Sequence, residues 1–243
     1  MRRNLTIDRG NTATKAVVWE GKSAILQISF PGPSCEDFRR IVEEYSPSVA
    51  ILCSVTDNND FIIDTLSELL GKENVQMLTN KTRVPLIIDY KTPDTLGPDR
   101  VAAAVGATVI NSGKTSLVVD IGTAITYDVV TSDRHFLGGN IAPGIGMRLR
   151  ALNAYTSRLP LIDSKGFTPL WGESTETAMR SGAVQGVIGE ILYYMSKLPE
   201  DATLITTGGW GTEMAALLPI KALVKPCLVS IGLNRILTYN ENK

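Results

Sequence analysis

A short stretch of this sequence occurs twice, and the repeat limits what the chain can fold into. The first copy runs from Leu5 to Val18 and the second from Leu117 to Val130, with leucine, aspartate, glycine, threonine and a closing Val-Val in register. Each copy predicts an apolar strand, a tight turn at Asp and Gly, and a second strand. A strand-end carboxylate can hold a metal ion, and glycine lets backbone N–H groups approach phosphate. Either copy alone would suit an ordinary hairpin, but two copies in register predict related half-domains with a nucleotide between them.

Composition is typical of a soluble globular protein. The 243 residues suffice for one large domain or two of modest size, and 44% are hydrophobic while 20% are charged. A formal net charge of −1 gives no overall field that would favour nucleic acid or an anionic membrane. The three cysteines (Cys35, Cys53 and Cys227) form no CxxC pair or Cys/His cluster, which favours the reducing cytoplasm. We expect no signal peptide and no membrane-spanning segment.

Hydrophobic periodicity predicts the same opening in both halves. The expected strands of the first half are residues 4–8, 14–19, 24–30, 49–53 and 75–78. Helices are expected after Ser34, which forms a capping-box variant with Asp37, and from Asn58-Asn59-Asp60, which gives the order βββαβαβ. The second half repeats three strands, expected at 117–121, 125–131 and 135–137, and residues 138–146 read as a glycine-rich loop. We therefore predict two α/β halves, residues 1–113 and 114–243.

The segment from Asp8 to Lys15 has the residue types that bind phosphate. Lysine supplies a point charge for a polyphosphate, and Asn11 and Thr12 can donate to phosphate oxygens. The segment is neither a Walker A loop nor a Rossmann fingerprint, because the spacing of each is absent. In the second copy Tyr127 stands where the first has Lys15.

A second group lies at the loop–helix junction Gly97-Pro98-Asp99-Arg100. Helix N-termini attract anions, and an arginine fork suits a carboxylate or a phosphate. Asp99 could accept a proton from a hydroxyl. The structural alternative is an Asp helix cap beside a surface arginine.

A further glycine-containing segment has both a ligand-binding and a purely structural interpretation. Thr207-Gly208-Gly209 after a strand suits the adenosine side of a nucleotide site or a plain turn. The single histidine, His135, is expected at the surface, where it supports no triad or zinc site.

Five ordered signatures give the chain a family resemblance over nearly its whole length. They are D-x-G-N-T-x-x-K at Asp8 to Lys15, Y-x-x-P-x-x-L-G-x-D-R at Tyr90 to Arg100, D-x-G-T-A-x-T at Asp120 to Thr126, G-G-x-I-x-P-G at Gly138 to Gly144, and G-x-x-T-x-x-A at Gly172 to Ala178. In these the chain resembles the type III pantothenate kinases, within the superfamily of acetate and sugar kinases, heat-shock chaperones and actin. The resemblance implies the actin-like ATPase fold, with duplicated ribonuclease H-like βββαβαβ halves and the nucleotide in the cleft between them.

The resemblance also implies an activity: ATP-dependent phosphorylation of pantothenate to 4′-phosphopantothenate, the first step of coenzyme A biosynthesis. It implies that Asp99 is the general base. The implied ATP-binding positions are Asp8, Arg9, Gly10, Asn11, Thr12, Ala13, Thr14, Lys15 and Thr123. The implied pantothenate-binding positions are Tyr90, Gly97, Pro98, Asp99, Arg100 and Thr175. Mg²⁺ is expected with ATP, K⁺ or NH₄⁺ at Asp120, and a cytoplasmic homodimer is the expected assembly.

One position departs from the family pattern, because Arg9 stands where an aliphatic residue is usual. Its side chain could reach phosphate or an acidic neighbour, or point to solvent, and solvent is favoured. Two other functions stay open: a non-catalytic regulatory or ligand-sensing relative of the same fold, and an actin- or chaperone-like ATPase. The intact residues at Asp8 to Lys15 and at Asp99 speak against the first, and the Tyr90–Arg100 segment against the second.

Overall fold

The computed structural model describes residues 2–241. By its contacts the chain forms two compact units, the first made of Met1–Gly113, Ser132–Leu137 and Cys227–Lys243, and the second of Lys114–Thr131 and Gly138–Pro226. The halves expected from the sequence duplication, residues 1–113 and 114–243, are a different division of the chain, and they stay a prediction. Its outermost positions, Met1, Asn242 and Lys243, lie outside the described residues.

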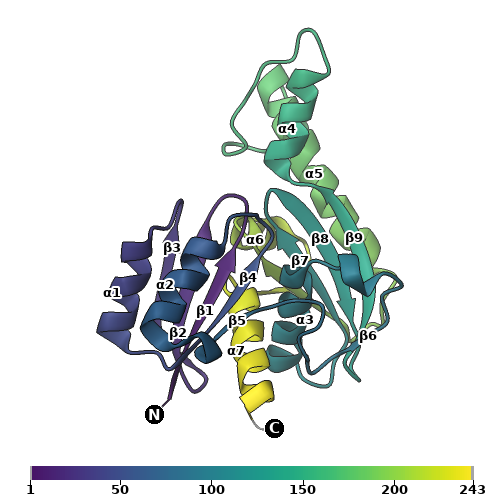
Figure 1. The fold of residues 1–243 in the computed structure, drawn as a ribbon. Helices are drawn as coiled ribbons and strands as arrows, with labels where there is room; N and C mark the ends of the chain where they lie inside the picture. Colours follow the sequence, from purple (N-terminus) through teal and green to yellow (C-terminus); the bar gives the residue numbers. More distant parts are fainter. Residues whose placement is uncertain (1, 242–243) are drawn as a thin grey trace. The chain divides into compact units, whose positions relative to one another are not determined.

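The first unit contains a five-stranded sheet in the order β3-β2-β1-β4-β5 (Figure 1). Its strands are β1 (Arg3–Arg9), β2 (Thr14–Glu20), β3 (Ser23–Phe30), β4 (Val49–Ser54) and β5 (Val75–Met77). The hairpin partners β2 and β3 are antiparallel, whereas β4 and β5 run parallel to β1. Helices α1 (Cys35–Tyr45) and α2 (Asp60–Leu70) make the connections, so the predicted order βββαβαβ is confirmed. The predicted capping box of Ser34 and Asp37 is present at α1.

Alternation along the strands separates two faces of this sheet. On one face Leu5 and Ile7 are fully buried against a core that includes Phe38 of α1 and Ile62 of α2. The opposite face includes Asn4, whose Nδ2 donates to Oδ1 of Asn234 at 2.8 Å. Asn234 belongs to α7 (Leu228–Glu241), the last helix of the chain. The C-terminal helix therefore packs on the sheet that the N-terminus begins.

Helix α3 (Pro98–Ile110) packs closely against α7 through two glycines. A Cβ added to Gly106 would collide with the carbonyl oxygen of Leu228, and one added to Gly232 with that of Ala102. The missing side chains let the two backbones touch, as the alanine-rich sequence of α3 also suggests. This contact fixes the helix whose first turn holds Asp99 and Arg100.

The second unit repeats the strand order of the first as β9-β8-β7-β10-β11. Its strands are β7 (Ser116–Ile121), β8 (Ala124–Val130), β9 (His135–Pro143), β10 (Thr203–Thr207) and β11 (Ala222–Val224), and its helices are α4 (Ile145–Ala154), α5 (Thr175–Met195) and α6 (Gly211–Leu217). The central strand β7 again has an antiparallel hairpin partner and a parallel neighbour, β10. The duplication read from the sequence is therefore a duplication of topology.

Strand β9 begins with three residues that belong to the first unit. There it pairs in parallel with β6 (Ile87–Ile88). Two short 3-10 turns, η1 (Lys72–Asn74) and η2 (Pro93–Thr95), complete the described elements. Within residues 2–241 no helix is both long and apolar enough to cross a membrane.

One predicted element is wrong, because residues 138–143 continue β9 instead of forming a loop. A Cβ on Gly139 would collide with the carbonyl oxygen of Tyr127 on β8. The glycine therefore serves close strand packing, whereas sequence reasoning took it as a loop signal.

Removing the glycine contact of α3 and α7 should destabilise the first unit. Gly232→Ala should lower the free energy of unfolding by about 1–3 kcal/mol, since the added methyl group has no space. The matched control is Gly189→Ala in α5, where an added Cβ has nothing within 4 Å and where alanine should gain up to ~1 kcal/mol. Urea unfolding monitored by circular dichroism measures both, and equal midpoints for the two variants would contradict the contact.

Candidate active site

The phosphate-type segment forms the hairpin between β1 and β2. Asp8 is the half-buried next-to-last residue of β1, and its Cα partners are Lys15 on β2 and Cys53 on β4. Gly10 N donates to Ala13 O at 3.0 Å and closes the turn. Asn11 and Thr12 are exposed at its tip. The fold thus presents the segment as a tight polar turn at the end of the central strand.

The pKa values of two cysteine thiols are influenced by charged groups near this strand end. Burial raises the pKa of Cys53, and the negative charges of Asp8 and Asp99 raise it further. Burial also raises the pKa of Cys227, which the charge of Lys15 lowers and that of Asp8 raises. Asp8, Lys15 and Asp99, predicted from separate motifs, therefore share one electrostatic environment within the first unit.

The side chain of Arg9 turns towards the start of α2. Its Nη1 donates to Asn58 O at 2.7 Å and to Oδ1 of Asn59 at 3.0 Å, and its guanidinium carbon lies 5.2 Å from the ring centre of Phe61. These partners are two neutral oxygens and a ring. Arg9 therefore neither contacts an acidic neighbour nor points to open solvent, which were two of the positions considered from the sequence. The arginine links the end of β1 to the loop that precedes α2.

Asp99 lies in the first turn of α3 and folds back on the backbone. Its Oδ1 accepts from Arg100 N at 2.9 Å, and a Cβ on Gly97 would lie only 2.5 Å from the same oxygen. Burial raises the pKa of Asp99, while backbone hydrogen bonds and the charge of Arg100 partly oppose the increase. The helix-cap alternative is wrong, because the N-cap of α3 is Gly97 and Asp99 lies inside the first turn. A surface arginine is wrong, because Arg100 is only 6% exposed.

Arg100 packs against two aromatic rings. Its guanidinium carbon lies 5.5 Å from the ring centre of Tyr90 and 5.7 Å from that of Phe136. Sequence reasoning placed Tyr90 near Arg100 but missed Phe136, which is fully buried in β9.

The second copy of the repeat lies in the second unit, surrounded by glycine-bearing segments. A Cβ on Gly208, at φ +83°, would collide with Oδ1 of Asp120, and one on Gly144 would collide with the carbonyl oxygens of Gly122 and Thr123. Gly144 N donates to Thr123 O at 3.0 Å. Asp120 is half-buried and Thr123 exposed. The carboxylate of Asp120 supplies oxygen, the type of ligand that hard cations prefer.

The two copies differ in register as well as in sequence. Asp8 has Lys15 as its cross-strand Cα partner, whereas Asp120 has Thr126. Tyr127, which the sequence alignment placed at the lysine position, faces Val119 instead. A shorter hairpin loop in the second copy accounts for the shift, and a hydroxyl residue therefore stands opposite the second aspartate.

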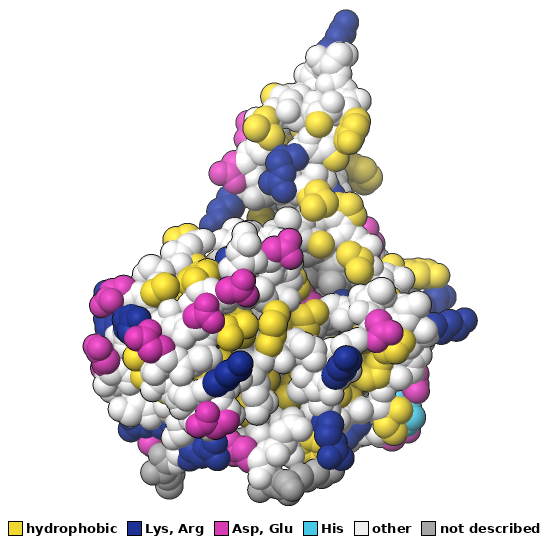
Figure 2. Space-filling view, in the orientation of Figure 1, with side chains coloured by type: hydrophobic (Ala, Val, Ile, Leu, Met, Phe, Trp, Pro, Cys, Tyr) yellow, Lys and Arg dark blue, Asp and Glu magenta, His cyan; other side chains and the backbone are white. Residues whose placement is uncertain are grey.

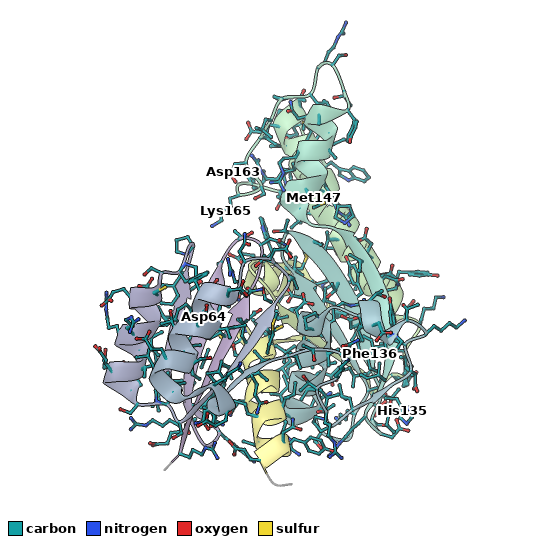
Figure 3. The ribbon with its side chains drawn as sticks, viewed as in Figure 1. Asp64, His135, Phe136, Met147, Asp163 and Lys165 are labelled. Carbon is teal, nitrogen blue, oxygen red and sulfur yellow. The ribbon has the colours of Figure 1, made fainter. Side chains whose placement is uncertain are left out.

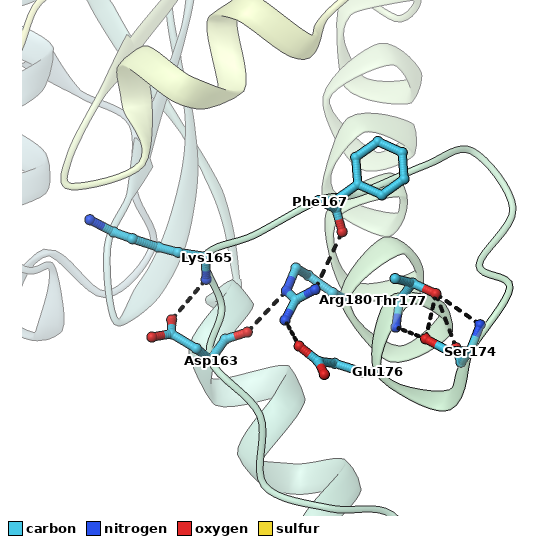
Figure 4. A network of polar contacts seen from close by, with 7 residues as sticks. All are labelled: Asp163, Lys165, Phe167, Ser174, Glu176, Thr177 and Arg180. Atoms are coloured by element: carbon cyan, nitrogen blue, oxygen red, sulfur yellow. Dashed lines mark hydrogen bonds and ion pairs between the residues drawn. The ribbon is translucent and has the colours of Figure 1, made fainter.

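Thr175 is the exposed first residue of α5 in the second unit. Ser174 caps the helix by accepting from Thr177 N, and Thr177 Oγ1 accepts in return from Ser174 N at 3.0 Å (Figure 4). Arg180, one turn on, pairs with Glu176 and donates to the carbonyl oxygens of Asp163 and Phe167. These contacts fix the start of α5 and the loop that leads to it.

No ready-made metal cage is found in residues 2–241, where no group of three or more His, Cys, Asp or Glu side chains could hold an ion. Magnesium bound with a nucleotide commonly takes one or two carboxylates and completes its shell with phosphate and water. Asp8 beside the Gly10 turn fits that pattern.

Known proteins are similar to this chain over nearly its whole length. The profile of the family described as type III pantothenate kinase matches residues 4–197. A relative with that name from Azobacteroides pseudotrichonymphae is 39% identical over 239 residues, which cover 98% of this chain and 97% of the relative. Another with that name, from Bacteroides fragilis, is 38% identical over 244 residues, 99% of each chain. The chain belongs to the type III pantothenate kinase family.

Solved structures support the fold. A protein titled a putative Baf family transcriptional activator, from Campylobacter jejuni, has a TM-score of 0.64 at 22% identity and covers 98% of this chain and 100% of its own. The ROK hexokinase of Thermus thermophilus has a TM-score of 0.55 at 16% identity, with coverage of 99% and 100%. At such identities the likeness concerns the fold alone, and it confirms the predicted actin-like ATPase and sugar kinase fold for this family member.

The raised pKa of Asp99 should make the stability of this type III pantothenate kinase family member depend on pH. Burial holds the pKa of Asp99 above its ordinary value of 3.8. The folded state then binds more protons than the unfolded state between the two values, so stability falls as pH rises through that window. Asp99→Asn removes this penalty and can still accept from Arg100 N.

We therefore expect Asp99→Asn to have a higher melting temperature than the parent at pH 7, with the difference shrinking towards pH 4. Each kcal/mol corresponds to roughly 2–4 °C for a protein of this size. The control is Asp64→Asn on α2, an exposed aspartate labelled in Figure 3, which should change stability by less than about 0.5 kcal/mol. A lower melting temperature for Asp99→Asn at pH 7 would contradict the prediction.

Proposed function

We propose that this protein transfers the γ-phosphoryl group of ATP to the terminal hydroxyl of pantothenate, giving 4′-phosphopantothenate in the first step of coenzyme A biosynthesis. The observation that carries the proposal is the half-buried Asp99, with its raised pKa, next to the buried Arg100 at the start of α3. It lies in a chain that matches the type III pantothenate kinases over nearly its full length.

ATP binds at the β1–β2 turn. Backbone N–H groups and the side chains of Asn11 and Thr12 contact phosphate oxygens, and Lys15 supplies positive charge. The remaining ATP-binding positions are Asp8, Arg9, Gly10, Ala13, Thr14 and Thr123. Arg9 takes part through its backbone and by holding the start of α2, since its guanidinium already contacts Asn58 and Asn59. Mg²⁺ bound beside Asp8 would neutralise charge on the phosphates.

Asp99 is the general base. The substrate hydroxyl oxygen attacks the γ-phosphorus, its proton passes to the Asp99 carboxylate, and the bond to the ADP oxygen breaks. Because burial raises the pKa of Asp99, its carboxylate is a stronger base than an exposed aspartate. Most of the catalysis in such reactions comes from positioning and charge stabilisation.

Arg100 binds the pantothenate carboxylate. Its planar fork can make two parallel hydrogen bonds to a carboxylate, and burial strengthens that charge pairing. Tyr90, Gly97 and Pro98 are further pantothenate-binding positions in the first unit, and the family resemblance adds Thr175 at the start of α5. Asp120 holds a K⁺ or NH₄⁺ ion with the help of neighbouring backbone oxygens.

The protein acts as a cytoplasmic homodimer. Supporting this, the segment that follows α4 exposes large apolar side chains: Tyr155 (89% exposed), Leu161, Phe167, Leu170 and Trp171 (80%). Figure 2 shows hydrophobic side chains along the surface of α4 and its continuation. An open groove of about 390 Å³ between α4 and α5 is lined by Ala151, Leu152 and Gly182. Apolar patches of this kind mark interaction surfaces.

The activity is tested by a coupled ADP-release assay with and without pantothenate, in potassium and in sodium. We expect ADP release only with pantothenate, and faster in potassium. Hydrolysis that ignores pantothenate would indicate an actin- or chaperone-like ATPase. No turnover with any substrate would indicate a non-catalytic relative.

Single substitutions separate the two roles at the start of α3. Asp99→Ala should lower kcat by about 10²–10⁴-fold and leave ATP binding intact. Arg100→Ala should raise the pantothenate KM at least about tenfold, which is roughly 1.4 kcal/mol of binding. The control, Arg39→Ala, breaks an exposed ion pair with Glu68 and should leave both constants unchanged. Full activity of Asp99→Ala would remove it as the base.

The homodimer is tested by light scattering after size-exclusion chromatography. The parent should have the mass of two chains. Trp171→Glu should shift it towards one, because a charge on an apolar contact surface opposes burial. Ile25→Glu, at a 38% exposed position of β3 in the first unit, is the control and should stay dimeric. A monomeric parent would refute the assembly.

A further inference from the structure

The guanidinium of Arg100 contacts two aromatic rings in a buried setting. Its central carbon is 5.5 Å from the Tyr90 centroid and 5.7 Å from that of Phe136, both within the range of cation–π attraction. The rings themselves are 6.2 Å apart and tilted by 59°. Arg100 is 6% exposed and Phe136 is fully buried. Packing between two rings restricts the rotamers that the Arg100 side chain can adopt.

Strand pairing explains why the two rings meet at Arg100. β6 pairs in parallel with the start of β9, which brings Ile88 opposite Phe136. Asp89 N donates to Phe136 O at 3.0 Å. Tyr90 is the residue after Asp89. The bond therefore holds the backbone next to Tyr90 against Phe136, so the two residues that carry the rings lie close together.

A side-chain contact reinforces the same pairing. Nδ1 of His135 and Oδ2 of Asp89 lie 2.7 Å apart. Successive strand residues point to opposite faces, so His135 is partly exposed while Phe136 is buried, and Figure 3 shows the two as neighbours on β9. The outer face thus carries a polar contact and the inner face the aromatic pair.

We infer that Phe136 is a positioning residue for the Arg100 guanidinium, and that with Tyr90 it sets the affinity of the protein for an anionic substrate. This rests on the proposed function, in which Arg100 binds the pantothenate carboxylate. The rings restrain the guanidinium and exclude water from it, while its in-plane N–H groups stay suited to hydrogen bonds. A restrained fork loses less conformational entropy when it binds a carboxylate.

The competing view is that Phe136 only fills the core. Both views allow Phe136→Leu to lower stability, so the experiment must separate ring electrostatics from volume. Replacing Phe136 by 4-fluoro-, 3,5-difluoro- and 3,4,5-trifluorophenylalanine changes the shape little but progressively weakens the negative ring face. If the ring positions Arg100, each fluorine added should raise the pantothenate KM and the Kd measured by calorimetry. The total change should be about tenfold, with kcat and the ATP KM within about twofold.

Phe136→Leu extends the series, and Phe38→Leu is its matched control. Phe38 is also fully buried in the first unit, but it packs in the core beneath α1 and α2. Phe136→Leu should raise the pantothenate KM about tenfold and Phe38→Leu should leave it unchanged, although both lose stability. If Phe136→Leu fails to fold, the fluorinated series still decides.

The outcomes distinguish this inference from the proposed function. Pantothenate constants that stay flat across the fluorinated series, in a parent that phosphorylates pantothenate, would overturn the role of Phe136 and leave the proposed function intact. A parent that neither binds nor phosphorylates pantothenate would overturn the proposed function, and the inference with it.

Discussion

The contact between α3 and α7 determines where the candidate chemistry lies. Two glycines, Gly106 and Gly232, let the helix backbones touch. α7 is in turn held to the central sheet by the bond of Asn234 to Asn4. Asp99 and Arg100 lie in the first turn of α3, so their position follows from the packing of the whole helix and not from the loop before it. A residue buried by a rigid element keeps its geometry better than one on a mobile loop. This arrangement suits a reaction that depends mainly on positioning.

Local signals carried most of the fold prediction. The capping box of Ser34 and Asp37 marks the start of α1 by nearby residues alone. The repeated Asp-x-Gly hairpin then predicted a duplicated topology, and five strands of the second sheet do have the order of the first, with β6 added at the edge. The candidate site was predictable to the same extent, because Asp8 to Lys15 and Tyr90 to Arg100 are continuous motifs. Their roles as binding and catalytic residues remain proposals.

The features that were missed all depend on contacts distant in sequence. Gly139 read as a loop residue because nothing nearby reveals that Tyr127 O approaches it from the next strand. Phe136 read as an ordinary strand residue, since only the β6–β9 pairing brings it to Arg100. Arg9 had several plausible partners, and the one it has, the start of α2, lies some fifty positions later in the chain. Tertiary packing therefore overrides local propensity at these three positions.

The two hairpins of the repeat differ in loop length, and in our proposal they also differ in role. In the first, the strand-end carboxylate has a lysine opposite it, which suits a turn that must carry phosphate charge. In the second, the shorter loop shifts the register and places Thr126 opposite Asp120. Tyr127 then points into the core, where burial and its hydrogen bond to Glu190 raise its pKa and keep it a donor. Glu190 also pairs with Arg148 of α4. The residue that aligns in sequence with Lys15 thus contributes to helix packing in the second copy, where a hydroxyl residue stands opposite the carboxylate.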